Sequence, residues 1–164
     1  MNQEERSIKR DRMRYIKNST SSNLCYLAIL LDVFYFVSIC KSDVGTYYYT
    51  ILIGAVIIYN LAFMLAAFLA SEGVKNYRKN YSYLLFALGI GQFIRIFIIP
   101  MRAHSVTTVV NGAETLVMHN GQFFRVVIYL VLSGVCLIAS AAINLYKCSE
   151  LKEHEKMMST PRTA

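Results

Sequence analysis

The sequence predicts an all-α membrane protein, a bundle of four transmembrane helices with both termini in the cytoplasm. Of the 164 residues, 55% are hydrophobic, and the mean hydropathy is +0.41. These apolar residues are concentrated in four long blocks, and basic residues lie between and beside the blocks. The helices of soluble proteins keep a polar face, whereas these blocks are apolar around their whole circumference. That pattern indicates contact with lipid.

The blocks divide the chain into three parts. Residues 1–22 form a basic juxtamembrane segment, residues 23–146 the transmembrane domain, and residues 147–164 a polar cytoplasmic tail. A bilayer is crossed by about 20 helical residues. On that basis the four expected spans are about 23–40, 46–71, 82–100 and 123–146.

Basic residues outside the spans are unevenly distributed. The amino-terminal flank has six, the second loop three and the tail four, whereas the first and third loops have only Lys41 and Arg102. Cytoplasmic loops are enriched in Lys and Arg, so we expect both termini inside. The expected location is the plasma membrane. This distribution also explains the net charge of +7. We expect no nucleic-acid partner, because no recognised binding motif accompanies the charge.

The longest connection, residues 101–122, predicts a small β-hairpin in the outer loop between helices three and four. Two β-prone runs, 106–110 and 113–118, flank the dipeptide Asn111-Gly112. Asn-Gly favours a type I′ turn, because both of its turn residues need positive φ. An isolated hairpin is marginally stable in water. We therefore expect Asn111 and Gly112 to belong to an element that docks on the bundle or on a partner.

Isolated polar residues interrupt the spans at roughly one depth. They are Asp32 in the first span, Asn60 in the second, Gln92 and Arg95 in the third and Ser133 in the fourth. A charge at that depth costs roughly 3 kcal/mol on insertion scales, so other groups must offset it. Arg95 lies about one turn nearer the outer face, and its long side chain can reach inward to Asp32 or outward to water.

Two interpretations of this polar cluster are open. In the first, Asp32 and Arg95 neutralise each other and the amides complete the hydrogen bonds, so that the cluster is a structural clamp. In the second, the cluster is an ion, proton or substrate path with Asp32 as the titrating group. The sequence favours the clamp, because it has one convincing intramembrane acid and no internal repeat of the kind that transporters use.

Small residues mark helix faces that allow close packing. In the second span they recur at every fourth position, two glycines stand in the third span and one in the fourth. Small residues let the backbones of neighbouring transmembrane helices approach closely. The predicted helix-packing residues are Ala62, Ala66, Ala70, Gly89 and Gly134.

No set of residues with catalytic or metal-binding spacing is recognisable. The cysteines Cys25, Cys40, Cys136 and Cys148 are read as small apolar side chains, and His104 and His119 match no zinc spacing. We therefore expect no enzyme activity, no cofactor and no metal.

These observations lead to two functional hypotheses. The first is a non-enzymatic accessory or scaffolding subunit of a larger membrane complex, for example a transporter. The second is a small oligomeric carrier or channel that uses Asp32. Besides the lipid bilayer, the expected partner is another membrane protein subunit or a second copy of the chain.

Overall fold

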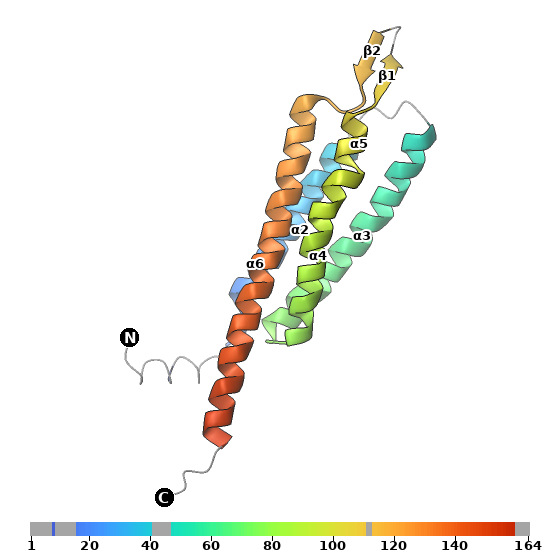
Figure 1. Ribbon diagram of the computed structural model, residues 1–164. Helices are drawn as coiled ribbons and strands as arrows, with labels where there is room; N and C mark the ends of the chain where they lie inside the picture. Colours follow the sequence, from blue (N-terminus) through green and yellow to red (C-terminus); the bar gives the residue numbers. More distant parts are fainter. Residues whose placement is uncertain (1–7, 9–15, 41–46, 111–112, 160–164) are drawn as a thin grey trace, which may run out of the picture.

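The computed structural model describes residue 8 and residues 16–40, 47–110 and 113–159. The four long helices are α2 (Ser19–Cys40), α3 (Tyr47–Lys75), α4 (Lys79–Ile98) and α6 (Asn120–Ser159). The short elements are α5 (Pro100–His104), β1 (Thr107–Val110) and β2 (Ala113–Leu116). Figure 1 shows the long helices side by side as a bundle. We call the end that carries the strands the hairpin end, and the end where α2 begins the terminal end.

All four long helices are long and apolar enough to cross a membrane. The qualifying segments are Ser19–Ile39, Gly54–Lys75, Lys79–His104 and Asn120–Lys156. Large apolar side chains such as Leu30, Ile58, Ile94 and Ile128 are about half exposed or more on the outside of the bundle. Such a surface suits lipid rather than water. The four predicted spans are confirmed as helices of the required length and hydropathy.

The helices differ from the predicted spans mainly at the terminal end. α2 begins at Ser19, before the predicted start at 23, and α3 runs to Lys75. α6 has 40 residues and continues through Ser159 without a break at 146. In Figure 1 its last part extends beyond the other helices. The lysines and glutamates after Tyr146 are good helix formers, so they end the apolar span without ending the helix.

Two apolar clusters fill the interior. The terminal-side cluster consists of Cys25, Ala28, Phe63, Ala67, Ala70, Val74, Leu85, Leu137 and Ala141. The hairpin-side cluster consists of Tyr35, Ile39, Val56, Ala103, Met118, Val126 and Leu130. Both contain side chains from α2, α3 and α6, so the helices pack against one another near both ends.

α4 and α6 pack closely at two glycines. A Cβ atom on Gly89 would lie 2.7 Å from Ile138 Cγ1 and 3.2 Å from the Gly134 carbonyl oxygen. A Cβ atom on Gly134 would lie 2.9 Å from Phe93 Cε2. Larger residues would therefore push the helices apart, and the two predicted glycines lie against each other.

The predicted alanine face of α3 is not the face that packs inside the bundle. Ala62 is exposed and Ala66 half-buried, and only Ala70 is buried. The buried face instead follows a spacing of alternately four and three residues: Val56, Asn60, Phe63, Ala67, Ala70 and Val74. The physical reason is that a helix has 3.6 residues per turn, so a strict four-residue row drifts around the helix away from the core.

The two strands stand at the hairpin end and pair antiparallel. Thr107 is opposite Leu116, and Val110 is opposite Ala113. The strands join the bundle through Met118, which is buried in the hairpin-side cluster. Asn111 and Gly112 lie outside the described residues, so the type I′ turn and its docking role stay predictions.

Candidate functional site

The side chain of Arg95 in α4 reaches Asp32 in α2. Arg95 Nη1 lies 3.0 Å from Asp32 Oδ1, and the two side chains are 3% and 0% exposed. Of the two directions open to Arg95, the structure has the inward one. A buried pair of opposite charges is tolerated only when the groups neutralise each other and their remaining polar atoms are hydrogen-bonded.

Amide and hydroxyl groups complete this arrangement. Gln92 Nε2 donates to Asp32 Oδ1 at 3.1 Å and to Ser133 Oγ at 3.3 Å. Arg95 donates to Asn60 Oδ1 through Nη2 and to Gln92 Oε1 through Nη1, the latter at 3.4 Å. The structure thus brings together the five predicted residues from α2, α3, α4 and α6. We call Asp32, Asn60, Gln92, Arg95 and Ser133 the central polar layer.

Two tyrosines also contact the guanidinium group of Arg95. Its Cζ atom lies 4.1 Å from the ring centroid of Tyr35 and 4.8 Å from that of Tyr59. Aromatic faces attract cations, more strongly where water is excluded. Neither tyrosine is among the residues predicted from the sequence to belong to this cluster. The available signal was that Tyr35 is three residues after Asp32, a spacing that places both on one helix face.

The central polar layer lies between the two apolar clusters. On α2, α3 and α6 the polar residue stands between one member of each cluster: Ala28 and Tyr35 around Asp32, Val56 and Phe63 around Asn60, and Leu130 and Leu137 around Ser133. Asp32, Asn60 and Ser133 are themselves fully buried. Among the described residues, apolar side chains therefore close the layer in both directions along the bundle axis.

Some polar atoms in the layer and on the adjacent Tyr35 have no hydrogen-bond partner within the described part of the chain. They are Asp32 Oδ2, Tyr35 OH, Asn60 Nδ2 and Arg95 Nε. Both bonds to the carboxylate end on Oδ1. A mutually satisfied clamp does not explain these unpartnered atoms, and Asp32 Oδ2 is the one among them that belongs to the carboxylate.

Beside the layer, a groove of about 410 Å³ opens between α3 and α4. Its walls are mainly apolar and include Ala55, Ile94 and Ile98, with Tyr59 and Arg95 also lining it. Apolar walls favour an acyl chain or the side chains of another helix over a charged solute.

A second set of buried polar groups joins the helices at the terminal end. Asn18 Nδ2 donates to Asn144 Oδ1 at 3.1 Å, and Asn144 Nδ2 donates to Ser82 Oγ at 2.7 Å. Ser140 Oγ donates to the Ser21 carbonyl at 2.7 Å. We call Asn18, Ser21, Ser82, Ser140 and Asn144 the terminal polar layer. The sequence reasoning missed it, although Asn144 stands visibly within an apolar span.

The histidines and cysteines named in the sequence analysis do not form a metal site among the described residues. No cluster of three or more His, Cys, Asp or Glu side chains is placed to hold a metal ion there. His104 stacks on Phe123, with ring centroids 4.6 Å apart, and its Nδ1 lies 3.2 Å from the Met118 carbonyl oxygen. These contacts give His104 a packing role at the hairpin end.

Comparison with known proteins yields no relative: no protein-family model, curated protein or solved structure matches the chain. The inference about function therefore rests on the geometry of the molecule.

Proposed function

We propose that this chain is a non-enzymatic accessory or scaffolding subunit of a larger membrane complex. It would span the plasma membrane four times, with both termini in the cytoplasm. The observation that carries the proposal is the closure of the central polar layer by an apolar cluster on each side. A charge pair that apolar side chains close off along the bundle axis holds helices together, whereas a translocation path needs polar groups that continue to both surfaces.

The outside of α3 supports docking of a partner helix. The groove between α3 and α4 has apolar walls and small residues, Ala55 and Gly91, at its surface. On the same helix Ala62 is exposed and Ala66 half-buried. Small residues on an outer face allow the close helix approach that holds membrane subunits together.

Co-purification from membranes of the source cells in mild detergent tests this proposal. We expect the tagged full chain to carry a larger membrane protein in stoichiometric amount. Ala55→Trp should fill the groove and reduce the amount of that partner. Ala142→Trp is the matched control, because Ala142 is an exposed alanine on α6 that does not line the groove. Recovery of the chain alone, or equal loss in both variants, would contradict this docking arrangement.

The second candidate is a small oligomeric carrier or channel that uses Asp32. Asp32 Oδ2 favours it, because this oxygen has no hydrogen-bond partner among the described residues and is available to take up a proton. A purified homo-oligomer that moves a solute into vesicles, and that Asp32→Asn inactivates without unfolding, would establish this candidate in place of the first.

The orientation has a separate test in a cysteine-free variant that carries one new cysteine. A cysteine replacing Lys75, at the terminal end of α3, should not react with an impermeant thiol reagent added outside the cell. A cysteine replacing Ala113, at the start of β2, should react. The reason is the excess of Lys and Arg at the terminal end. The opposite labelling pattern would reverse the proposed topology.

A further inference from the structure

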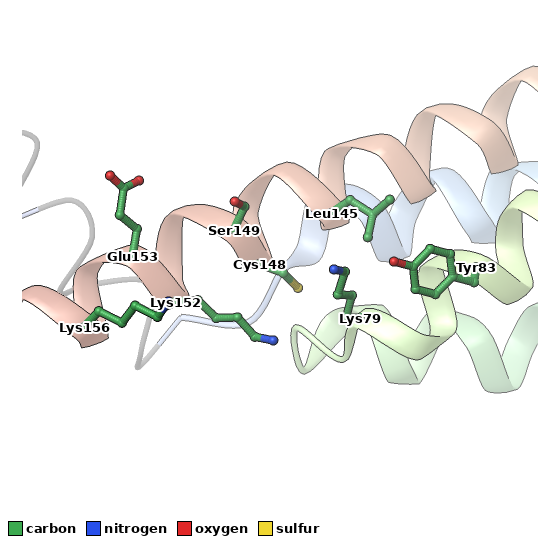
Figure 2. Close-up of a pocket in the computed structure, with 8 residues that line it drawn as sticks. All are labelled: Lys79, Tyr83, Leu145, Cys148, Ser149, Lys152, Glu153 and Lys156. Atoms are coloured by element: carbon green, nitrogen blue, oxygen red, sulfur yellow. The ribbon is translucent and has the colours of Figure 1, made fainter.

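A pocket of about 530 Å³ lies at the terminal end, between the start of α4 and the last part of α6. Figure 2 shows the side chains that line it. Lys79 and Tyr83 come from α4, and Leu145, Ser149 and Lys152 are among those from α6. The pocket exists because α6 continues beyond the apolar span and brings its polar turns alongside the first turn of α4.

The charge in this pocket is predominantly positive. Lys79, Lys152 and Lys156 line it, and Glu153 is the one carboxylate among its lining residues. Lys152 and Lys156 are four residues apart, so they lie on one face of α6. In Figure 2 the carboxylate of Glu153 points away from Lys79, on the other side of α6. An anion in the pocket would therefore meet more ammonium groups than carboxylates.

The amino terminus of α4 adds to this positive field. Lys79 is the first residue of this 20-residue helix, and the N-cap residue Arg78 makes no side-chain cap hydrogen bond. The first backbone N–H groups of a helix have no partner within the helix, and the helix dipole is positive at this end. Phosphate groups bind at such positions because both effects favour a negative charge.

The polar and apolar sides of the pocket match the two parts of a phospholipid. The apolar span of α4 begins at Lys79, so Lys79 lies where lipid headgroups would be. Tyr83 and Leu145 line the side toward the membrane interior, and the Lys79 ammonium lies 5.9 Å from the Tyr83 ring. Tyrosine at this depth contacts headgroups and chains together. A free inorganic anion has no apolar part that could contact this apolar wall.

We propose that this pocket binds the phosphate of an anionic phospholipid, with the acyl chains lying against the exposed apolar surface of α4 and α6. The site does not depend on the accessory role. In the proposed orientation it faces the cytoplasmic leaflet, where basic residues attract anionic lipids.

Topology alone does not require this arrangement. Orientation in the membrane depends on how many Lys and Arg residues flank the spans, and not on their forming a pocket. Lys17 and Arg78 are exposed at the same end but do not line the pocket. They therefore distinguish a specific site from a general attraction between the basic surface and anionic lipid.

Lipid binding to the purified full-length chain, measured by native mass spectrometry in detergent, tests the site. The probes are phosphatidylglycerol and, as the zwitterionic control, phosphatidylcholine. We expect one phosphatidylglycerol to bind preferentially. The variant K79Q/K152Q should weaken that binding about 30-fold, roughly fivefold for each lysine. The variant K17Q/R78Q loses the same charge and should weaken it by less than about threefold.

Two further measurements complete the test. Ser149→Trp should fill the pocket without changing the charge and should also weaken phosphatidylglycerol binding. Circular dichroism should show that all variants stay folded, because every substituted side chain is exposed. Equal loss in K79Q/K152Q and K17Q/R78Q, or unchanged binding in the first, would overturn the pocket. Displacement of the lipid by millimolar inorganic phosphate would overturn the lipid as the source of the bound phosphate.

Discussion

The central and terminal polar layers differ in the kind of buried polar group that joins the helices. Both join α2, α4 and α6 through buried polar side chains. The central layer uses an ion pair, Asp32 and Arg95, supported by amides and aromatic rings. The terminal layer uses neutral amides and hydroxyls. At the edge of this layer, Lys147 Nζ donates to Asn18 Oδ1 at 2.8 Å.

The terminal layer also completes helix ends. The Asn18 backbone N–H donates to the Lys75 carbonyl, at the end of α3, at 2.9 Å. Asn144 Nδ2 lies 3.4 Å from the carbonyl oxygen of Arg78, the N-cap residue of α4. The Lys75 carbonyl is a helix-end group without an intrahelical partner, and a neutral backbone N–H is sufficient to bond it. For a charge at mid-depth a neutral partner is not sufficient, because only an opposite charge offsets the loss of hydration. We therefore expect substitutions in the central layer to have the larger effects.

The largest effect is expected for Arg95→Gln. It leaves the Asp32 carboxylate buried without its cation and should lower the free energy of unfolding by about 3–5 kcal/mol. Asp32→Asn should cost less, because Asn60, Tyr35 and Tyr59 still surround the guanidinium group. Thermal unfolding in detergent measures both.

The double variant D32N/R95Q is the control for this pair. It contains neither charge, so it should be more stable than Arg95→Gln alone, and the double-mutant cycle should give a coupling well above zero. A coupling indistinguishable from zero would refute the clamp. In that case an Asp32→Asn protein that folds normally but loses transport would favour the carrier.

The terminal polar layer is tested by Asn144→Leu. This change removes the acceptor of Asn18 and the donor to Ser82, both of which are buried. Buried polar groups that lose a partner cost about 1–3 kcal/mol, so we expect roughly 2 kcal/mol. Asn80→Leu is the control at an exposed position of α4 and should have little effect. A loss as large as that of Arg95→Gln would show that charge does not distinguish the two layers.

The helix contact beside the central layer is tested by Gly89→Ala. The new Cβ would lie 2.7 Å from Ile138 Cγ1, and such overpacking typically costs about 1–3 kcal/mol. Alanine recovers up to about 1 kcal/mol in helix propensity, so the net loss should be near 1 kcal/mol. Gly54→Ala is the matched control, because nothing lies within 4 Å of its Cβ position. It should leave stability unchanged or raise it slightly. Equal melting temperatures for the two variants would argue against the close α4–α6 contact.

The smallest effect is expected for Tyr35→Phe. The Tyr35 hydroxyl has no hydrogen-bond partner among the described residues, whereas the ring lies 4.1 Å from Arg95 Cζ. Phenylalanine keeps the ring, so the melting temperature should barely change. Tyr35→Leu removes the aromatic face and should cost about 1–2 kcal/mol. If both variants lose the same stability, the ring makes no special contribution to the central polar layer.

The five residues of the central polar layer were predictable because depth is a one-dimensional property. Counting along each span places Asp32, Asn60, Gln92 and Ser133 at similar heights, and the arginine side chain covers the remaining distance. The glycines Gly89 and Gly134 were recognisable for a related reason, since small residues in a span have few other uses. The start of α2 was not predictable, because its first residues are polar and fit the flank, and their bonds to Asn144 and Ser140 depend on the tertiary structure.

The sequence by itself determined the number of helices able to cross a membrane and the height of the polar groups, because length and hydropathy act along each helix separately. Only the tertiary structure decided which face of α3 is buried, which rings contact Arg95 and that Lys79 and Lys152 line one pocket. Those features depend on how each helix is rotated about its axis and on how far α6 continues beside α4. A rotation of about 100° exchanges the neighbours of Ala66 and Ala67 while leaving the composition of the span unchanged, so composition alone does not specify it.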